Sequence, residues 1–382
     1  MAFPYLHRIS YMLKTLKTRK HAMKVIHAKK GAMQTNPGAN REPSLESDSA
    51  NSLRANREPS LGSTRSPRRG ATLLIANPTA HSGKGQQAAE FVARFFGAYT
   101  TTTSEFEIRM TSHAGEATEI ARGAAGADTV IALGGDGVIH EAVNGLMRIP
   151  AATRPRLGIV AIGTGNDFAR TLAAPLNGPE QAVHQLLHAH ERAYDVGVVD
   201  AGTPHEQYFM QTLSFGLDAA IALDTTDRRA AQTRQQGAAL FATSGIKIMG
   251  QAHEGWPYRA TLVDETGATQ EIAGTEVIFA VQNGPSYGGG FRITPDASPA
   301  DGLLDLCRNV DIPGIPTVLT LFGLARKGKH SGSRHIAFHR LTHLEVVFPA
   351  EEPPTQIDGE RLTGTSHTVD VVPGALRVLA GR

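Results

Sequence analysis

Residues 129–147 read TVIALGGDGVIHEAVNGLM, and this stretch decides the fold class. It begins with the apolar run Thr129–Leu133, which predicts a buried strand, and continues into the glycine-rich turn GGDG at 134–137. A helical pattern then extends to about Met147. The stretch is therefore one strand, turn and helix unit.

The same unit occurs twice more, once on each side of this stretch. Thr72–Ala76 predicts a strand that leads through NPTAHSGKG, at 77–85, into a helix over Gln86–Phe96. Leu157–Ile162 predicts a strand that leads through GTGND, at 163–167, into another helix. Strands rich in Val, Ile and Leu that alternate with helices predict a parallel sheet with helices on both faces.

The pattern changes after about Asp195, where short strand-like runs follow one another and helices become rare. We therefore expect an α/β domain over residues 71–195 and a second, mostly antiparallel domain over 196–382, a β-sandwich. Helical insertions are expected around Gln232–Met249 and Val318–Arg326. The expected strands are Ala260–Val263, Glu276–Val281, Leu303–Cys307, Leu344–Phe348 and Thr368–Val372.

Residues 1–70 have a different composition and are expected to be a disordered basic extension. They hold 14 Lys and Arg against 4 Asp and Glu, whereas the rest of the chain holds 24 against 32. The heptapeptide ANREPSL occurs at 39–45 and again at 55–61. The first 34 residues contain eight basic and no acidic side chains, which also fits a transit peptide, a membrane-surface helix, or a start codon placed too far upstream, with Met33 among the alternatives.

Composition excludes several classes of protein. Cys307 is the only cysteine, so the chain has no intrachain disulfide and no cysteine zinc site, and a cytoplasmic location fits. No stretch has the roughly 18 uninterrupted apolar residues of a membrane span. The basic excess lies in the extension rather than on a folded face, and aromatic residues make up 6% of the chain, so we expect no nucleic-acid partner.

The three predicted turns are expected to meet at one edge of the sheet, because parallel strands end at the same edge and open α/β folds bind ligands there. In the GGDG turn, backbone N–H groups without a Cβ in the way, at a helix N-terminus, favour phosphate. Asp136 suits a polyphosphate only with a divalent cation such as Mg²⁺ between them, and Asp167 repeats the arrangement one strand away. Any one turn alone is better explained as a tight turn with a capping Asp or Asn. Together they favour a phosphate site, although the spacings of a P-loop and of a dinucleotide fingerprint are absent.

Two motifs with an Asp-Gly pair lie in the second domain. SPADGLLD occupies 298–305, after GGGF at 288–291, and IDGE occupies 357–360. An Asp-Gly pair between strands is first of all a hairpin turn. The chemical alternative for Glu360 is a general base that takes a proton from a substrate hydroxyl.

Taken together, these motifs resemble those of the diacylglycerol kinase catalytic-domain family, which includes sphingosine and ceramide kinases and bacterial soluble lipid kinases. The resemblance rests on Asn-Pro at 77–78, GGDG at 134–137, GTGNDFAR at 163–170 and DGE at 358–360, and it extends from about Ala71 to the end of the chain. It implies a nucleotide-binding α/β domain and a β-sandwich domain with the active site in the cleft between them. It also implies transfer of the γ-phosphate of ATP to a lipid hydroxyl.

The same resemblance assigns roles to residues of this chain. Glu360 would be the general base, joined by Asp136 and Asp167 in a network of magnesium and water. A structural magnesium ion would be held by the Asp301 side chain and by the carbonyl groups of Ser298 and Leu303. The residues expected to contact ATP are Asn77, Thr79, Thr111, Gly134, Gly135, Asp136, Gly137, Glu141, Gly163, Thr164 and Asn166.

Two positions depart from the family pattern. Val138 stands where the family usually has threonine, and His140 replaces a frequent asparagine before Glu141. Loss of one neutral hydrogen bond, worth about 0.5–1.5 kcal/mol, would weaken ATP binding up to roughly tenfold.

Several alternatives stay open. A nucleotide-binding regulator without kinase activity would fit Val138, and an NAD kinase would share the GGDG loop, although its downstream GSTAY-like motif is absent. The acceptor is a lipid alcohol, most simply diacylglycerol, with monoacylglycerol, phosphatidylglycerol, a sphingoid base or a polyprenol as further options. We expect peripheral contact with a membrane surface, helped by the basic extension. A homodimer is open, and acceptor choice is expected to depend on loops at 225–236 and 312–328.

Overall fold

The computed structural model describes residues 71–99, 105–231, 235, 237–249 and 255–381. The expected basic extension, residues 1–70, with its proposed disorder and membrane contact, lies outside the described residues.

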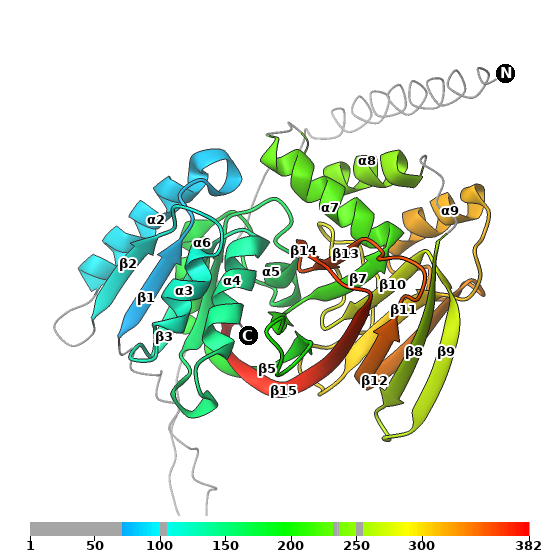
Figure 1. Cartoon of the computed structure of the whole chain (residues 1–382). Coiled ribbons are helices and arrows are strands. Elements are labelled where there is room, and N and C mark those ends of the chain that lie inside the picture. Colours follow the sequence, from blue (N-terminus) through cyan, green and yellow to red (C-terminus); the bar gives the residue numbers. More distant parts are fainter. Residues whose placement is uncertain (1–70, 100–104, 232–234, 236, 250–254, 382) are drawn as a thin grey trace, which may run out of the picture. The chain divides into compact units, whose positions relative to one another are not determined.

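The first half of the described chain is built on a parallel sheet with the strand order β2-β1-β3-β4 (Figure 1). Its strands pair in parallel, with Ala76 opposite Leu133 and Gly134 opposite Ala161. The elements are β1 (Thr72–Ala76), α2 (Ala80–Tyr99), β2 (Phe106–Met110), α3 (Glu116–Arg122), β3 (Thr129–Gly134), α4 (Asp136–Met147), a 3₁₀ turn (Ala151–Thr153), β4 (Arg156–Ala161), α5 (Asp167–Thr171) and α6 (Pro179–His188).

Alternate residues of β1 enter two different hydrophobic cores. Leu73 and Ile75 pack with α3 and α4 on one face, whereas Leu74 and Ala76 pack with α2 and α6 on the other. Side chains of a strand point to opposite faces in turn, so a strand buried on both faces must be apolar throughout. The predicted parallel sheet covered on both faces is therefore confirmed.

Helix α2 begins earlier than predicted, at Ala80 rather than Gln86. His81, Ser82 and Gly83 have left-handed backbone conformations, so the helix is kinked there and regular only after Gly83. A Cβ at Gly85 would stand 2.1 Å from the carbonyl oxygen of Asn77, so only glycine fits where the helix passes the loop after β1.

The second half is mostly antiparallel. Its elements are β5 (His190–Val199), β6 (Gln207–Phe209), β7 (Thr212–Gly216), α7 (Leu217–Ala230), α8 (Gly237–Met249), β8 (Trp256–Asp264), β9 (Thr269–Glu276), β10 (Ile278–Gln282), β11 (Leu304–Asn309), α9 (Ile315–Ala325), β12 (Ile336–Val347), β13 (Thr355–Ile357), β14 (Glu360–Leu362) and β15 (Ser366–Ala380). Phe215, Phe279 and Phe348, all fully buried, lie in the core between its layers of strands. The predicted β-sandwich is confirmed.

Helix α7 was not predicted, because its Thr and Asp residues have low helix propensity and the packing that stabilises it is tertiary. The expected loop at 225–236 therefore begins as a helix. The other expected loop, 312–328, contains α9, which begins three residues earlier than the predicted Val318.

Strand β15 joins the two halves (Figure 1). It pairs antiparallel with β12 and β5, and near its end Val378 lies parallel to Leu157 of β4. The sheet is thereby continuous through both halves. In the described part of the chain, no helix combines the length and hydropathy needed to cross a membrane.

Two buried carboxylic acids lie behind the sandwich helices. Glu276, at the end of β9, is fully buried, and neither of its carboxylate oxygens has a hydrogen-bond partner among the described residues. Burial, together with the nearby Asp218, raises the pKa of Glu276 well above its usual range. Burial also raises the pKa of Asp218 to about 6, although the Tyr287 hydroxyl donates to Asp218 Oδ2 at 2.6 Å.

Replacing Glu276 with glutamine should flatten the fall in stability at neutral and alkaline pH. The folded protein keeps a proton that the unfolded chain releases above about pH 4.5, so this stabilisation is complete below that pH and is lost as pH rises through the folded pKa. The measurement is the midpoint of urea unfolding at pH 5, 7 and 8. Glu271→Gln, on the exposed face of the same strand, is the control and should unfold like the parent at each pH. An unchanged pH slope in Glu276→Gln would refute a protonated Glu276.

Candidate active site

Four loops meet at the carboxyl edge of the parallel sheet. They follow β2 at Thr111, β1 at Asn77, β3 at Gly135 and β4 at Ile162. The strand registers place these ends side by side, as the sequence predicted. This is the edge at which open α/β sheets bind ligands.

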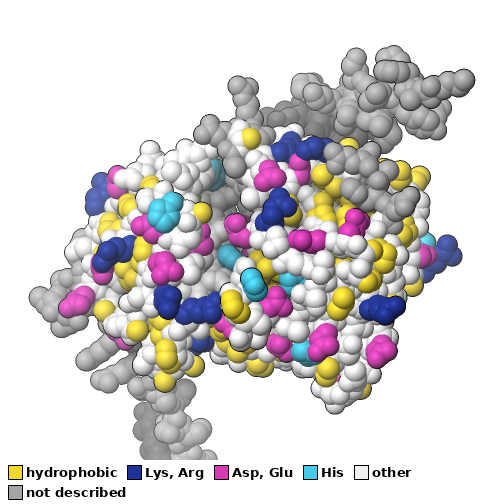
Figure 2. Space-filling model, in the orientation of Figure 1, with side chains coloured by type: hydrophobic (Ala, Val, Ile, Leu, Met, Phe, Trp, Pro, Cys, Tyr) yellow, Lys and Arg dark blue, Asp and Glu magenta, His cyan; other side chains and the backbone are white. Residues whose placement is uncertain are grey.

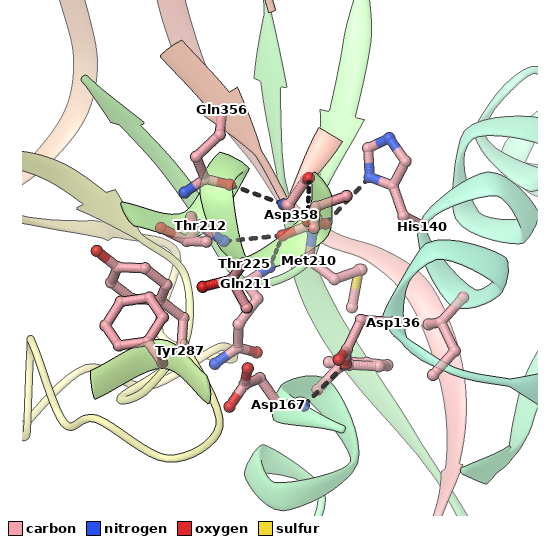
Figure 3. Close-up of a pocket in the computed structure, with 17 residues that line it drawn as sticks. Asp136, His140, Asp167, Met210, Gln211, Thr212, Thr225, Tyr287, Gln356 and Asp358 are labelled. Carbon is pink, nitrogen blue, oxygen red and sulfur yellow. Dashed lines mark hydrogen bonds and ion pairs between the residues drawn. The ribbon is translucent and has the colours of Figure 1, made fainter. Parts of the chain in front are cut away.

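Two of these loops touch through their backbones. A Cβ at Gly163 would stand 2.7 Å from the Cα of Gly135, so position 163 needs glycine for this close approach, whereas a Cβ at Gly135 would make an ordinary contact at 3.5 Å. Asp136 joins them further: its Oδ2 accepts the backbone N–H of Asn166 at 2.7 Å, and its Oδ1 accepts that of Asp167 at 2.8 Å (Figure 3). Asp136 thus ties the N-terminus of α4 to that of α5.

Asp167 makes the equivalent connection to the second half of the chain. It is 9% exposed, and its carboxylate accepts the backbone N–H groups of Gly289 and Gly290 at 2.9 Å. These glycines belong to the GGGF motif, whose purpose the sequence left unassigned. The motif supplies donors to a carboxylate from the α/β half.

The DGE motif forms the turn between β13 and β14, and Asp358 anchors it. Asp358 has a left-handed backbone, with φ 50°. Its carboxylate accepts the backbone N–H groups of Met210, Gln211 and Thr212 at 2.9, 3.0 and 2.9 Å (Figure 3). The turn is therefore fixed against the start of β7, so the residue that follows it has a defined position.

Glu360 is the first residue of β14, and it is exposed. Its Oε1 lies 3.4 Å from the point where a Cβ on Gly137 would stand. The DGE turn of the second half therefore presents a carboxylate to the glycine turn of the first half. Side chains that are more than 200 residues apart in sequence meet at this place.

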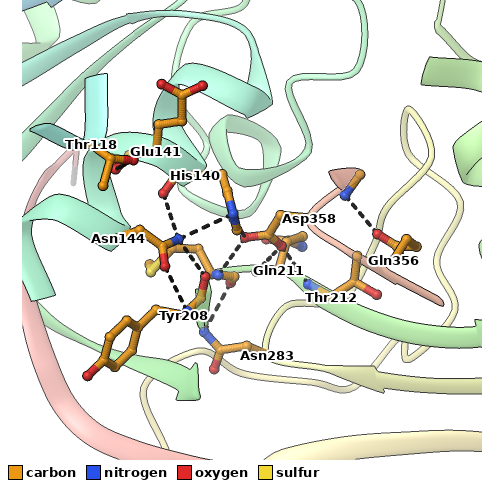
Figure 4. A network of polar contacts seen from close by, with 12 residues as sticks. Thr118, His140, Glu141, Asn144, Tyr208, Gln211, Thr212, Asn283, Gln356 and Asp358 are labelled. Carbon is orange, nitrogen blue, oxygen red and sulfur yellow. Dashed lines mark hydrogen bonds and ion pairs between the residues drawn. The ribbon is translucent and has the colours of Figure 1, made fainter. Parts of the chain in front are cut away.

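His140 of α4 links the two halves beside this turn. Its Nδ1 lies 3.2 Å from Asp358 Oδ2, and its Nε2 lies 3.3 Å from the amide nitrogen of Asn144 (Figure 4). Because the Asp358 carboxylate can only accept, His140 Nδ1 carries the proton that it donates to Asp358. Asn144 also exchanges two hydrogen bonds with the backbone of Tyr208. Sequence reasoning missed this link; its only signal is a pair of polar residues spaced i, i+4 on a buried helix face.

A pocket of about 590 Å³ lies where these motifs converge (Figure 3). Residues of both halves line it, among them Asp136, His140, Asp167, Gln211, Thr225, Tyr287 and Asp358. A second pocket of about 710 Å³ is almost wholly apolar and shares Phe241 and Tyr287 with the first. Its lining includes Leu217, Ile221, Val318, Leu321, Phe322 and Ala325.

Comparison with known proteins agrees with this arrangement. The family model of the diacylglycerol kinase catalytic domain matches residues 71–199, and that of the YegS C-terminal NAD kinase beta sandwich-like domain matches residues 211–380. A probable lipid kinase YegS-like protein of Yersinia enterocolitica is 30% identical over 273 residues, which cover 71% of this chain and 85% of that protein. The chain belongs to the YegS-like lipid kinase family.

Two further proteins named as diacylglycerol kinases are similar to this chain. A diacylglycerol kinase of Bacillus subtilis is 30% identical over 295 residues, which cover 75% of this chain and 88% of the relative. The crystal structure of a putative diacylglycerol kinase from Bacillus anthracis superposes with a TM-score of 0.63 at 23% identity, covering 82% of this chain and 97% of that one. At this identity the superposition shows a shared fold.

The residues predicted to contact ATP lie in or beside the edge loops, and several have structural partners. Asn77 Oδ1 accepts both the backbone N–H and the hydroxyl of Thr79, at 2.9 and 2.8 Å. Thr111 is buried, and its N–H donates to the carbonyl of Ala76 at 2.8 Å. Glu141 accepts the N–H groups of Gly115 and Ala117, at the start of α3. Contact of these residues with ATP stays a prediction.

The turn after β4 holds three more of the predicted ATP residues, Gly163, Thr164 and Asn166. Asn166 has a left-handed backbone, with φ 54°, and its amide nitrogen donates to the carbonyl of Gly163 at 3.0 Å. Its Oδ1 is buried without a hydrogen-bond partner among the described residues. Thr164 is half-buried. Val138, which replaces the family threonine, is buried and packs over Gly134, where its methyl groups fill the space beside the strand end.

At the predicted structural magnesium site, the Asp301 carboxylate already accepts hydrogen bonds from other groups of the protein. Asp301 Oδ2 accepts from Arg340 Nη2 at 2.7 Å, and Asp301 Oδ1 accepts from the N–H of Leu303 at 3.2 Å. Burial is the main cause that raises the pKa of Asp305 to about 6, and the negative charge of the nearby Asp301 raises it further. Within the described ranges, no three His, Cys, Asp or Glu side chains converge as a metal site. A cation at Ser298, Asp301 and Leu303 would have to share Asp301 with Arg340, and its binding there stays a prediction.

Proposed function

We propose that this protein transfers the γ-phosphate of ATP to the hydroxyl group of a lipid alcohol, diacylglycerol or a close relative. The observation that carries the proposal is the approach of Glu360 to Gly137, next to a pocket that their chain neighbours Gly359 and Asp136 line. A base from one half thereby faces the glycine turn at a helix N-terminus of the other. Phosphate transfer to an alcohol needs this juxtaposition of base and phosphate site.

Each part of the site has a chemical role in this proposal. The backbone N–H groups at the start of α4 bind phosphate oxygens, since Gly135 and Gly137 leave no Cβ in the way and the helix dipole favours anions. Glu360 Oε accepts the proton of the acceptor hydroxyl. Asp136 and Asp167 fix the two glycine turns relative to each other and to the GGGF loop.

Magnesium fits the carboxylates at this edge. Mg²⁺ is commonly held by one or two carboxylates together with waters and substrate phosphates, so it does not require a cage of three acids. Asp136 and Glu360 are the residues that would hold it, directly or through water. When bound, Mg²⁺ would neutralise phosphate charge.

The apolar second pocket supports a lipid acceptor over a soluble one. It adjoins the polar pocket at Phe241 and Tyr287, and its lining includes apolar side chains of α7, α8 and α9. An acyl chain in this pocket would leave its hydroxyl group in the polar pocket, which Asp358 and Gly359 of the DGE turn line. An NAD kinase would have no use for such a lining, and a regulator without activity would have no use for Glu360.

The test is transfer of labelled γ-phosphate from Mg-ATP to a panel of lipid alcohols in mixed micelles. The expected result is labelling of one lipid class. NAD and glycerol, an alcohol without an acyl chain, serve as negative acceptors. ATP binding without transfer to any lipid would overturn the proposal in favour of a regulator, and labelling of NAD would favour the NAD kinase.

A further inference from the structure

Helix α9 is unusual among the surface helices because it has no polar face. It reads IPTVLTLFGLA and contains no charged residue. Its inward side chains, Val318, Phe322 and Ala325, line the apolar pocket or pack under the helix. Its outward side carries Ile315, 59% exposed, Leu319, 46% exposed, and Leu324, 37% exposed. A surface helix of a soluble domain normally places charged or polar residues there.

Exposed apolar side chains continue around this helix. Val310 and Ile312, which precede it, are 56% and 48% exposed. The neighbouring α8 packs on α9 through stacked Phe241 and Phe322 rings, 6.0 Å apart. Ile246 of α8 is 63% exposed, the largest value among the large apolar side chains of the described residues. Figure 2 shows hydrophobic atoms gathered at the upper right, where α9 lies in Figure 1.

A basic strip follows the helix directly. Arg326, Lys327, Lys329 and Arg334 are exposed, and no Asp or Glu occurs from Ile312 to Leu344. The body of the chain is acidic on balance, so a stretch of 33 residues without a carboxylate is a local departure. The strip gives the surface next to α9 a positive charge, which favours an anionic partner.

We propose that the outward face of α9 and the basic strip dock this protein onto an anionic phospholipid bilayer. We call Ile315, Leu319, Leu324, Arg326, Lys327 and Lys329 the α9 surface. Apolar side chains of an uncharged helix would enter the boundary between headgroups and acyl chains, and the adjacent basic residues would contact anionic headgroups. The inner face of the same helix lines the apolar pocket, so docking places that pocket against the bilayer. A second copy of the chain fits less well, because a two-fold contact would bring the basic strip close to its own equivalent.

A fluorophore on α9 tests this docking independently of residues 1–70. In the full chain, Leu319→Cys can be labelled selectively with an environment-sensitive dye, since Cys307 is completely buried. Vesicles of phosphatidylcholine with one third phosphatidylglycerol should shift the dye emission to the blue. Vesicles of phosphatidylcholine alone should shift it less, and high salt should reduce the response. Val347→Cys, at 43% exposure on β12, is the matched control and should not respond.

Charge substitutions complete the test. Ile315→Glu with Leu319→Glu should weaken vesicle binding by roughly tenfold or more, and Lys327→Glu with Lys329→Glu by a similar factor. Arg94→Glu with Arg122→Glu, in the α/β half, should have little effect. The inference would be overturned if vesicles did not change the emission of the dye at position 319, or if the α9 variants bound vesicles as tightly as the parent. A dimer in sedimentation without lipid that the α9 variants dissociate would overturn it too, in favour of contact between copies.

The inference deepens the proposed function, and the two can fail separately. The α9 variants should keep activity toward a short-chain, water-soluble acceptor, because Glu360 and the glycine turns are untouched. Vesicle docking without phosphate transfer would contradict the kinase proposal alone. Transfer by a protein that does not dock would contradict the α9 surface alone.

Discussion

Replacing Glu360 with glutamine should lower the rate of phosphate transfer to the lipid by about 10²–10⁴-fold, the usual contribution of a positioned general base. The side chain is exposed and near-isosteric with glutamine, so the fold should be unaffected. The amide can no longer accept the hydroxyl proton. The measurement is single-turnover transfer from saturating Mg-ATP, which reports the chemical step.

The control is Glu180→Gln, an exposed glutamate in the first turn of α6 that does not line the pocket. It should transfer at the parental rate. Binding of ATP to Glu360→Gln, followed with a fluorescent analogue, should stay within a few-fold of the parent. A mutant with parental single-turnover rates would remove Glu360 from the reaction.

Replacing Asp358 with asparagine should both destabilise the fold and slow transfer. Three backbone N–H groups and His140 converge on this carboxylate, and an amide would turn a donor toward at least one of them. We expect a loss of about 2–4 kcal/mol in the free energy of unfolding. Asparagine tolerates the left-handed backbone of position 358, so the change tests the carboxylate rather than the turn.

The kinetic effect of Asp358→Asn should be mainly on kcat, by about 10²-fold, because Glu360 would be displaced while the glycine turns proposed to bind phosphate stay in place. Urea unfolding and a full kcat and KM determination separate the two effects. The control is Asp264→Asn. Asp264 also accepts backbone N–H groups, but from its own turn in the remote hairpin between β8 and β9. A variant that is destabilised but keeps the parental kcat would assign Asp358 a structural role only.

The strand and turn units could be predicted because their signals are local. Thr72–Ala76, Thr129–Leu133 and Leu157–Ile162 are apolar throughout and end in glycine or asparagine turns, and the parallel register then brings the turns together. The individual ATP contacts and the structural magnesium site were assigned from the family resemblance, whereas the phosphate site and a cation at Asp136 were inferred from the glycine turns. All of these assignments stay predictions.

Contacts between distant segments could not be predicted. Asp167 accepts N–H groups 122 and 123 residues away, and His140 meets Asp358 across 218 residues. Such pairs depend on how two halves pack, and neither residue type nor spacing encodes that. The same holds for α7, whose helix is stabilised by packing against β7 and β13 rather than by propensity.

The course of β15 constrains how the chain is made. Residues near Val378 cover the edge of β4, and the Arg154 guanidinium donates to the carbonyl of Ala375 while Arg377 Nη2 donates to that of Arg154 at 2.9 Å. Synthesis proceeds from the N-terminus, so β4 leaves the ribosome more than 200 residues before its neighbour. During that interval the nascent α/β half exposes an apolar strand edge, an open template for pairing with other chains. The edge stays open until β15 has been synthesised and pairs with β4.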